Sequence, residues 1–286
     1  MGKKFATTRS FGAKNKKFIQ IGGAAMDNRD KIIFFGNGML ADYALGVLKQ
    51  KFEVVFHAKT RDDLEEVCRI KREEPRIHGV LASFGVLIKP EVLELFEPEG
   101  ILNIHPSLLP AYRGASPIES AILDGNSDFS VSIMKLVKEM DAGPIYYQTT
   151  LTDLPLCKND IYRALAETGA EWIADNLPNL PKPVSQDDSK ATFCGKLVKS
   201  MGTLTPETDT AEQIFRKIVA YQGFPKPKYA FFGISCIILE AHILKQGETA
   251  VLSIPCADGA LVAIDRLQPE GRKAMDAKAF INGYGK

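Results

Sequence analysis

Residues 31–41 constrain the fold more than any other stretch of this sequence. Lys31 to Gly36 reads KIIFFG, a continuous apolar run that predicts a strand buried on both faces. Gly36 and Gly38 follow, with Ala41 three positions on, and they open a predicted helix that runs to about Lys49. A buried strand, a tight glycine turn and a helix form the first unit of a Rossmann-like, mostly parallel α/β sheet.

The remaining hydrophobic pattern extends this sheet and then changes character. Expected strands cover 53–56, 78–87 with its C-terminal loop, 101–105, 129–137 and 145–150, and expected helices cover 62–72, 90–96, 116–123 and 159–177. Asn159 or Asp160 is the predicted cap of the last helix. A Pro-rich, polar stretch at 178–190 predicts a linker, and a helix at 210–221 precedes short strands at 229–232, 236–244, 250–256 and 261–267.

The glycines at 36 and 38 also fit a dinucleotide-binding fingerprint with Ala41 in third place, which keeps an NAD-binding protein open as an alternative. That fingerprint expects an acidic residue at the end of the second strand, about 20 residues on. Here that strand is followed by His57, Ala58 and Lys59. The sequence therefore favours a tight strand-to-helix turn over a nucleotide site.

Residues 101–118, ILNIHPSLLPAYRGASPI, hold the strongest chemical signal. Asn103 and His105 lie two apart at an expected strand end, so both side chains point to one side. Asp141 lies in the turn signal Met-Asp-Ala-Gly-Pro, ahead of the strand at 145–150. An amide that stabilises an oxyanion, an imidazole that moves a proton and a carboxylate that holds the imidazole form an acyl-transfer set. A histidine at a strand end is more often structural, so the residue types alone leave both interpretations open.

The longer pattern resembles the formyltransferases that use 10-formyltetrahydrofolate. Asn-x-His-Pro-Ser-Leu-Leu-Pro, then Arg-Gly, then Asp-Ala-Gly some 30 residues later stand here as in that family. The resemblance implies that the catalytic residues are Asn103, His105 and Asp141. It also implies that the folate site is lined by Ser107, Leu108, Leu109 and Pro110, with the backbone of Ala82 to Ile88 against the pteridine.

The end of the chain resembles the C-terminal domain of the methionyl-tRNA formyltransferase family, through Gln268-Pro-Glu-Gly-Arg-Lys-Ala-Met275 after a helix and a Phe-Pro turn. That domain is an OB-like barrel that helps to hold tRNA. The resemblance implies an α/β chain with a Rossmann-like formyltransferase domain at 30–178, a linker at 179–200 and a small β-rich domain at 201–286. Residues 1–29 are predicted to be a basic, disordered extension, with Met26 as an alternative start.

Composition excludes several classes of protein. The 286 residues are 45% hydrophobic and 25% charged with a net charge of +1, which is ordinary for a soluble chain. No apolar run approaches the ~18 residues that span a membrane. Five scattered cysteines and four histidines without a Cys/His cluster predict reduced thiols in the cytoplasm and no metal site.

One stretch departs from the family. Bacterial members of the family that the sequence resembles usually carry a long basic insertion after the second strand, whereas the segment from His57 to Gly79 is short and mixes both charges. Between Met1 and Met26 there are six Lys and Arg and no acid, so a compensating contact of this arm with RNA phosphates is a hypothesis.

The sequence thus predicts a monomeric, cytoplasmic enzyme that transfers a formyl group from 10-formyltetrahydrofolate to methionyl initiator tRNA. A formyltransferase acting on an amino sugar or on glycinamide ribonucleotide is the alternative, together with a formyltetrahydrofolate hydrolase and the NAD-binding protein.

Overall fold

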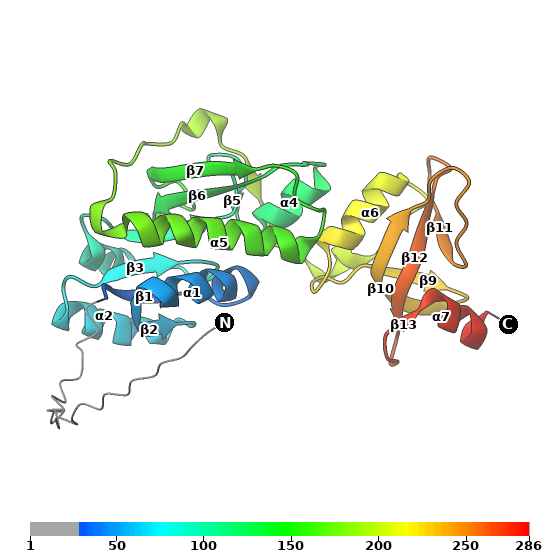
Figure 1. The fold of residues 1–286 in the computed structure, drawn as a ribbon, viewed down its shortest axis with the longest axis horizontal. Coiled ribbons are helices and arrows are strands. Elements are labelled where there is room, and N and C mark those ends of the chain that lie inside the picture. The colour runs from blue at the N-terminus through cyan, green and yellow to red at the C-terminus, as the bar shows by residue number, and fades with distance from the viewer. Residues whose placement is uncertain (1–28, 286) are drawn as a thin grey trace, which may run out of the picture.

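The computed structural model describes residues 29–285 and forms two lobes joined side by side (Figure 1). The first lobe is built on a six-stranded sheet in the order β2-β1-β3-β4-β6-β7. Its strands are Lys31–Phe35 (β1), Glu53–Ala58 (β2), His78–Leu81 (β3), Ile101–His105 (β4), Phe129–Lys135 (β6) and Ile145–Leu151 (β7). The first four strands run parallel, while β6 and β7 pair antiparallel.

Helices cover both faces of this sheet because its strands are apolar on both sides. One face packs against Met39–Lys51 (α1), Pro117–Leu123 (α4) and Lys158–Asn176 (α5). The other face packs against Asp63–Glu73 (α2), Pro90–Leu93 (α3) and the 3-10 turn Glu94–Phe96. The predicted Rossmann-like, doubly covered sheet is therefore confirmed.

The turn after β1 needs its two glycines for different reasons, close packing at Gly36 and a positive φ at Gly38. Gly36 has φ 145°, and a Cβ there would lie 1.8 Å from the carbonyl oxygen of Ala82. Gly38 caps α1 with φ 82°. The chain therefore needs glycine here to let β1 and the loop after β3 approach each other.

The second lobe is the small β-rich domain that the sequence predicts, and its antiparallel sheet is a half-barrel. Its strands are Lys228–Phe231 (β9), Ile234–Ile243 (β10), Ser253–Pro255 (β11), Leu261–Pro269 (β12) and Met275–Asp276 (β13). Ala211–Ala220 (α6) packs on β10 and β12, with Thr210 forming a capping box at its start. A closing helix, Ala277–Tyr284 (α7), was not expected from the sequence.

Two expectations need correction or lie outside the structure. The helix expected from Asn159 begins one residue earlier, at Lys158, and its N-cap is Cys157 without a side-chain bond. Neither Asn159 nor Asp160 is therefore the cap. Lys158 already belongs to the helix, and its side chain contacts the buried partners described below. The predicted disorder of the N-terminal extension lies outside the described residues.

The segment predicted to be a linker packs against the first lobe over part of its length. Val184 and Ile145 exchange backbone hydrogen bonds of 2.8 Å. Further on, Phe193–Cys194 (β8) pairs in parallel with Arg113–Gly114 (β5). No helix of residues 29–285 is long and apolar enough to cross a membrane.

Candidate active site

Asn103 and His105 lie on β4, at the carboxyl end of the parallel strands. The alternate residues Leu102 and Ile104 pack in the core under α1, α4 and α5. Period two therefore directs Asn103 and His105 to the opposite face of the sheet. Their placement agrees with the common rule that ligands bind beyond the carboxyl ends of strands in open α/β sheets.

The Asn103 side chain combines burial with an unused amide. The residue is only 5% exposed, yet its amide makes no hydrogen bond with any residue of the described chain. Among those residues, no fully enclosed side-chain nitrogen or oxygen lacks a partner, so this amide must border accessible space. A buried amide in that position can donate to a ligand oxygen without breaking a protein contact.

The His105 imidazole, 4% exposed, is held from both sides. Its Nε2 lies 3.0 Å from the carbonyl oxygen of Tyr112, and because a carbonyl only accepts, Nε2 carries a proton. Its Nδ1 lies 3.7 Å from Oδ1 of Asp141. Nδ1 is therefore the ring nitrogen left to exchange a proton, next to a carboxylate.

Asp141 sits in the turn between β6 and β7. Its φ is 49°, a left-handed backbone that is uncommon for a residue other than glycine. Its Oδ2 accepts a 2.8 Å bond from the backbone N–H of Gly114. Gly143 closes the turn tightly, since a Cβ there would lie 1.8 Å from the carbonyl oxygen of Lys135. The turn and the Gly114 N–H together aim Oδ1 at His105.

Two neighbouring strands hold the Ser-Leu-Leu-Pro loop. The Ser132 hydroxyl of β6 donates to the carbonyl of Ser107 (2.6 Å) and accepts from the N–H of Leu109 (3.1 Å). The Gln148 amide of β7 donates to the carbonyl of Leu109 and to the Ser132 hydroxyl, both at 2.8 Å. Ser107 itself donates to the carbonyl of Ala111 at 2.6 Å. The loop is thus rigid before any ligand arrives.

The two leucines of this loop differ in exposure. Leu108 is 48% exposed and offers an apolar surface, whereas Leu109 is buried beneath it. The carbonyl of Pro110 accepts a 3.2 Å bond from the N–H of Thr192 in the segment between the lobes. The loop therefore presents Leu108 to solvent from a fixed backbone.

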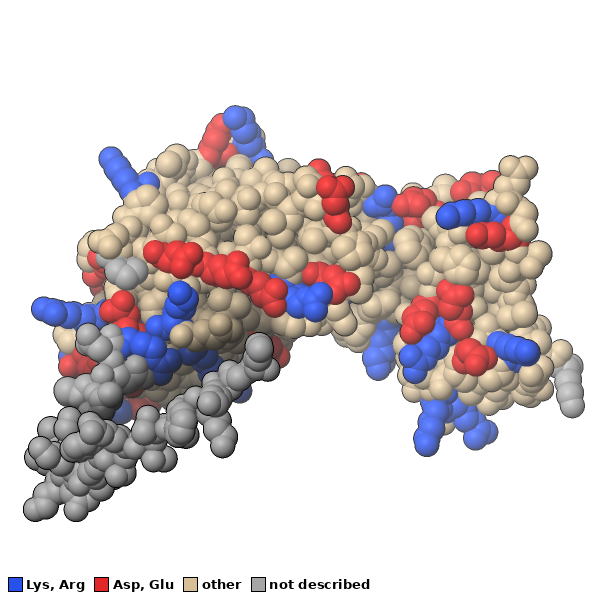
Figure 2. Space-filling model, in the orientation of Figure 1, with Lys and Arg blue, Asp and Glu red and all other residues tan. Residues whose placement is uncertain are grey.

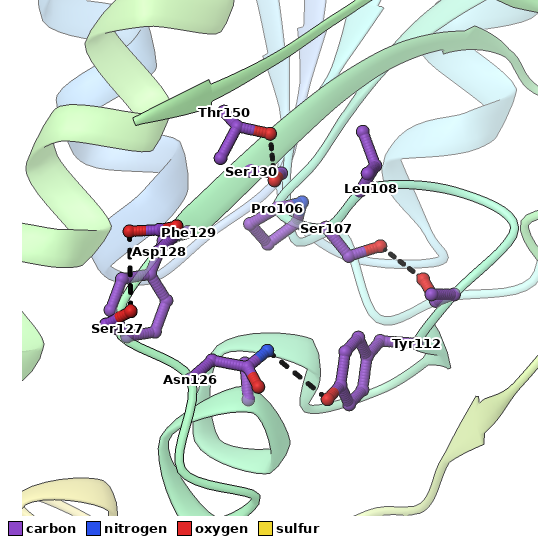
Figure 3. Close-up of a pocket in the computed structure, with 12 residues that line it drawn as sticks. Pro106, Ser107, Leu108, Tyr112, Asn126, Ser127, Asp128, Phe129, Ser130 and Thr150 are labelled. Atoms are coloured by element: carbon purple, nitrogen blue, oxygen red, sulfur yellow. Dashed lines mark hydrogen bonds between the residues drawn. The ribbon is translucent and has the colours of Figure 1, made fainter. Parts of the chain in front are cut away.

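A cavity of about 380 Å³ lies against the outer side of the same loop. Figure 3 shows Tyr112 and Asn126 on one side of it and Ser130 with Thr150 on the other. Asn103, His105 and Asp141 are not among its lining residues, which are Pro106, Ser107, Leu108, Ala111, Tyr112, Ala121, Asn126, Ser127, Asp128, Phe129, Ser130 and Thr150. The catalytic candidates therefore lie outside this cavity, although Pro106, Ser107 and Leu108 line it.

The stretch predicted to contact the pteridine forms the loop after β3. Ala82, Phe84 and Ile88 are buried, while Leu87 is exposed. The loop therefore turns alternate residues outward at the carboxyl edge of the sheet, next to the strand that carries Asn103.

Four supporting residues escaped the sequence analysis: Ser132, Gln148, Arg113 and Gln186. Ser132 and Gln148 face the loop only because β6 and β7 pair in this register. Arg113 stood inside the motif without an assigned role, and Gln186 lies in the proposed linker, where no local pattern marks it. No group of three or more His, Cys, Asp or Glu among residues 29–285 could hold a metal ion.

Comparison with known families gives the class of protein that carries this fold and this constellation. Residues 41–177 match the family described as formyl transferase, and residues 196–285 match the formyl transferase C-terminal domain. The chain belongs to the formyl transferase family.

Within that family, the chain is similar to methionyl-tRNA formyltransferases. The chain is 36% identical over 222 residues to the one from Granulibacter bethesdensis, covering 72% of this chain and 68% of the relative. It is 32% identical over 244 residues to one from Dehalococcoides mccartyi strain CBDB1, covering 80% and 77%. A solved methionyl-tRNA formyltransferase from Clostridium thermocellum superposes with a TM-score of 0.63 at 19% identity, over 84% of this chain and 98% of that one.

Proposed function

We propose that this chain transfers the formyl group of 10-formyltetrahydrofolate to the amino group of methionine on initiator tRNA. The proposal rests on the buried amide of Asn103, which bonds no other residue from 29 to 285 and shares a strand face with His105, the partner of Asp141. Both formyl transferase domains and the methionyl-tRNA formyltransferase relatives support the same reaction.

In the proposed reaction the methionine nitrogen attacks the formyl carbon, and a new C–N bond forms. The carbonyl electrons move to oxygen, where the Asn103 amide donates to the developing oxyanion. His105 takes the proton that the amine loses, at Nδ1, and returns it to N10 of the folate as the old C–N bond breaks. The products are formyl-methionyl-tRNA and tetrahydrofolate.

Asp141 orients His105 in this scheme and balances the charge that the imidazole gains. The carboxylate is itself fixed by the Gly114 N–H, so the imidazole works against a rigid partner. Such fixed dipoles and charges cost no reorganisation during the reaction, which is why they contribute strongly to transition-state stabilisation.

The folate would lie between the loop of residues 82–88 and the Ser-Leu-Leu-Pro loop. Exposed Leu87 and Leu108 offer apolar surface to the ring system, and the backbone groups of residues 82–88 offer polar contacts. A solved relative of the same fold, HypX from Aquifex aeolicus, was crystallised with tetrahydrofolic acid, at 18% identity and a TM-score of 0.67, over 90% of this chain and 47% of that one. That match supports the fold, and the proposed folate site rests on the residues above.

We also propose that the enzyme acts as a monomer in the cytoplasm. The five cysteines at 68, 157, 194, 236 and 256 are all free thiols. Free thiols suit a reducing compartment.

The test is transfer to charged tRNA. The protein is incubated with 10-formyltetrahydrofolate and Met-charged initiator tRNA, with Met-charged elongator tRNA as the control, and formyl-methionine is measured. We expect initiator-specific formylation that falls to a small residual rate in His105→Ala and Asp141→Ala. Folate binding without transfer to either tRNA would contradict the proposed acceptor and favour a small amine.

A further inference from the structure

The side-chain amide of Gln186 joins three segments that lie far apart in the sequence. Its Nε2 donates to the carbonyls of Asp141 (2.8 Å) and Gly143 (2.7 Å). Its Oε1 accepts from Nε (3.1 Å) and Nη2 (2.7 Å) of Arg113. Carbonyls only accept and a guanidinium only donates, so this amide has a single orientation that satisfies all four bonds.

The bonds to Asp141 and Gly143 fall on the part of the turn that most needs support. A non-glycine residue with φ of 49° persists only where its surroundings hold it. The two carbonyls that Gln186 binds flank the Asp141–Gly143 turn, and both bonds are shorter than a typical N–H···O bond. Gln186 therefore holds the backbone from which the Asp141 carboxylate projects.

The same residue closes a ring of contacts around that carboxylate. Arg113, which Gln186 binds, directly precedes Gly114, whose N–H donates to Oδ2 of Asp141. The Arg113 guanidinium is buried and also bonds Asp188 at 2.6 Å, which anchors it to the same segment as Gln186. Backbone and side chain of Asp141 are thus both fixed through one glutamine.

We infer that Gln186 is a positioning residue for formyl transfer, acting through Asp141 on His105. This inference rests on the proposed function. Gln186 lies against the first lobe, in the segment that joins the two lobes in the sequence. The catalytic carboxylate is therefore set in place by a segment outside the predicted catalytic domain. Without its amide, the turn relaxes and the carboxylate moves away from the imidazole.

Two variants separate this role from simple anchoring. Gln186→Met keeps the length of the side chain and removes all four bonds. Gln186→Glu keeps the oxygen that accepts from Arg113, but it replaces the N–H donor with a second oxygen facing the carbonyls of Asp141 and Gly143. This variant provides the test if Gln186→Met does not fold. Asp187→Ala is the matched control, because within residues 29–285 the Asp187 side chain bonds only Ser189 and Lys190 of its own segment.

We expect both Gln186 variants to lower kcat by up to about 100-fold, with KM unchanged for both substrates, since a small displacement of a catalytic group costs this much. The Asp187 control keeps the parent kcat. In an Asp141→Ala background, Gln186→Met adds no further loss, because the group that it positions is gone. Full activity in Gln186→Glu, or equal losses in both backgrounds, would overturn the inference.

A second readout does not depend on the acceptor. The imidazole ¹⁵N resonances of His105, assigned by comparison with His105→Gln, should shift in Gln186→Met in the direction that Asp141→Asn shifts them. Resonances that stay at the parent position in Gln186→Met would refute the inference. If the parent protein formylates no tRNA, the proposed function fails, while these resonances still decide whether Gln186 holds Asp141.

Discussion

The Asn103 amide is buried yet makes no bond with any residue from 29 to 285, whereas buried polar groups are nearly always paired. Because the Asn103 amide forms no hydrogen bond with those residues, it contributes little to the stability of the fold. Its placement beside His105 makes sense if the bond forms only with the reacting oxygen.

Asn103→Ala should therefore separate activity from stability. We expect kcat to fall by about 100- to 1000-fold, the usual cost of removing one oxyanion donor. No protein hydrogen bond is lost, so urea unfolding should show a free energy close to that of the parent. Steady-state kinetics and urea titration measure the two effects, and a kcat that stays within about 10-fold of the parent would exclude the oxyanion role.

The reactivity of the five cysteine thiols tests which of them are buried. Burial raises the pKa of the Cys194, Cys236 and Cys256 thiols, so less of each is thiolate at a given pH. We expect iodoacetamide to label partly exposed Cys68 and Cys157 in the native protein and the other three only after unfolding. Mass spectrometry of the labelled peptides checks this, and rapid native labelling of Cys194 would contradict the packing of β8 against β5.

Sequence reasoning succeeds at this scale where a local pattern carries the information. Asn103 and His105 share a face because a strand has period two, and the turn at Asp-Ala-Gly is predicted from its turn-favouring residues. Gln186 and Gln148 escape because hydrogen bonds between distant segments leave no local periodicity. Only the folded chain brings those amides to the loops they support.

Among the elements, α5 ties the two lobes together. Buried Lys158 lies 2.7 Å from Oε1 of Glu119 on α4 and donates to the carbonyls of Ala220 (2.8 Å) and Gln222 (3.0 Å) at the end of α6. A cation at a helix C-terminus also interacts favourably with the helix dipole. Tyr162 donates to Glu119 at 2.8 Å, and burial raises the pKa of this tyrosine far above its usual range.

Removing one partner of this pair should cost much more than removing both. Lys158→Met leaves Glu119 buried without its cation, and we expect a loss of about 3–5 kcal/mol in the free energy of unfolding. The double variant Lys158→Met/Glu119→Gln should recover a large part of that loss, because no buried charge is left unpaired. Urea unfolding of the two variants measures this, and equal stability of the single and double variants would contradict it.

The same pair explains why the start of α5 was predicted wrongly. Asn159 and Asp160 are good capping residues by type, but the helix begins at Lys158 so that this side chain reaches Glu119 and α6. Strands and helices with strong periodicity were predicted within a few residues of their observed ends. Tertiary partners set the ends that local rules missed.

Charge over the whole molecule bears on how a polyanionic substrate docks. Lys and Arg alternate with Asp and Glu over both lobes on the face in Figure 2, and acidic side chains follow α5 across it. Phosphates would be repelled from that row, so we expect tRNA to approach another face. The short segment from His57 to Gly79 adds no basic surplus, since its six Lys and Arg are balanced by six Asp and Glu. Its Arg69 is also paired with Glu66 and Glu73.

The six Lys and Arg before Met26 are the next candidates for contacts with tRNA phosphates. Deleting residues 2–25 should therefore weaken tRNA binding and reduce its salt dependence. Each phosphate contact contributes roughly 0.7–0.9 to the slope of log K against log salt, so six contacts would make it shallower by about four to five units. Replacing the six by Gln at constant length should act like the deletion if charge is the cause. Filter binding across a salt series measures the slopes, and parent-like slopes in both variants would mean that residues other than 2–25 supply the phosphate contacts.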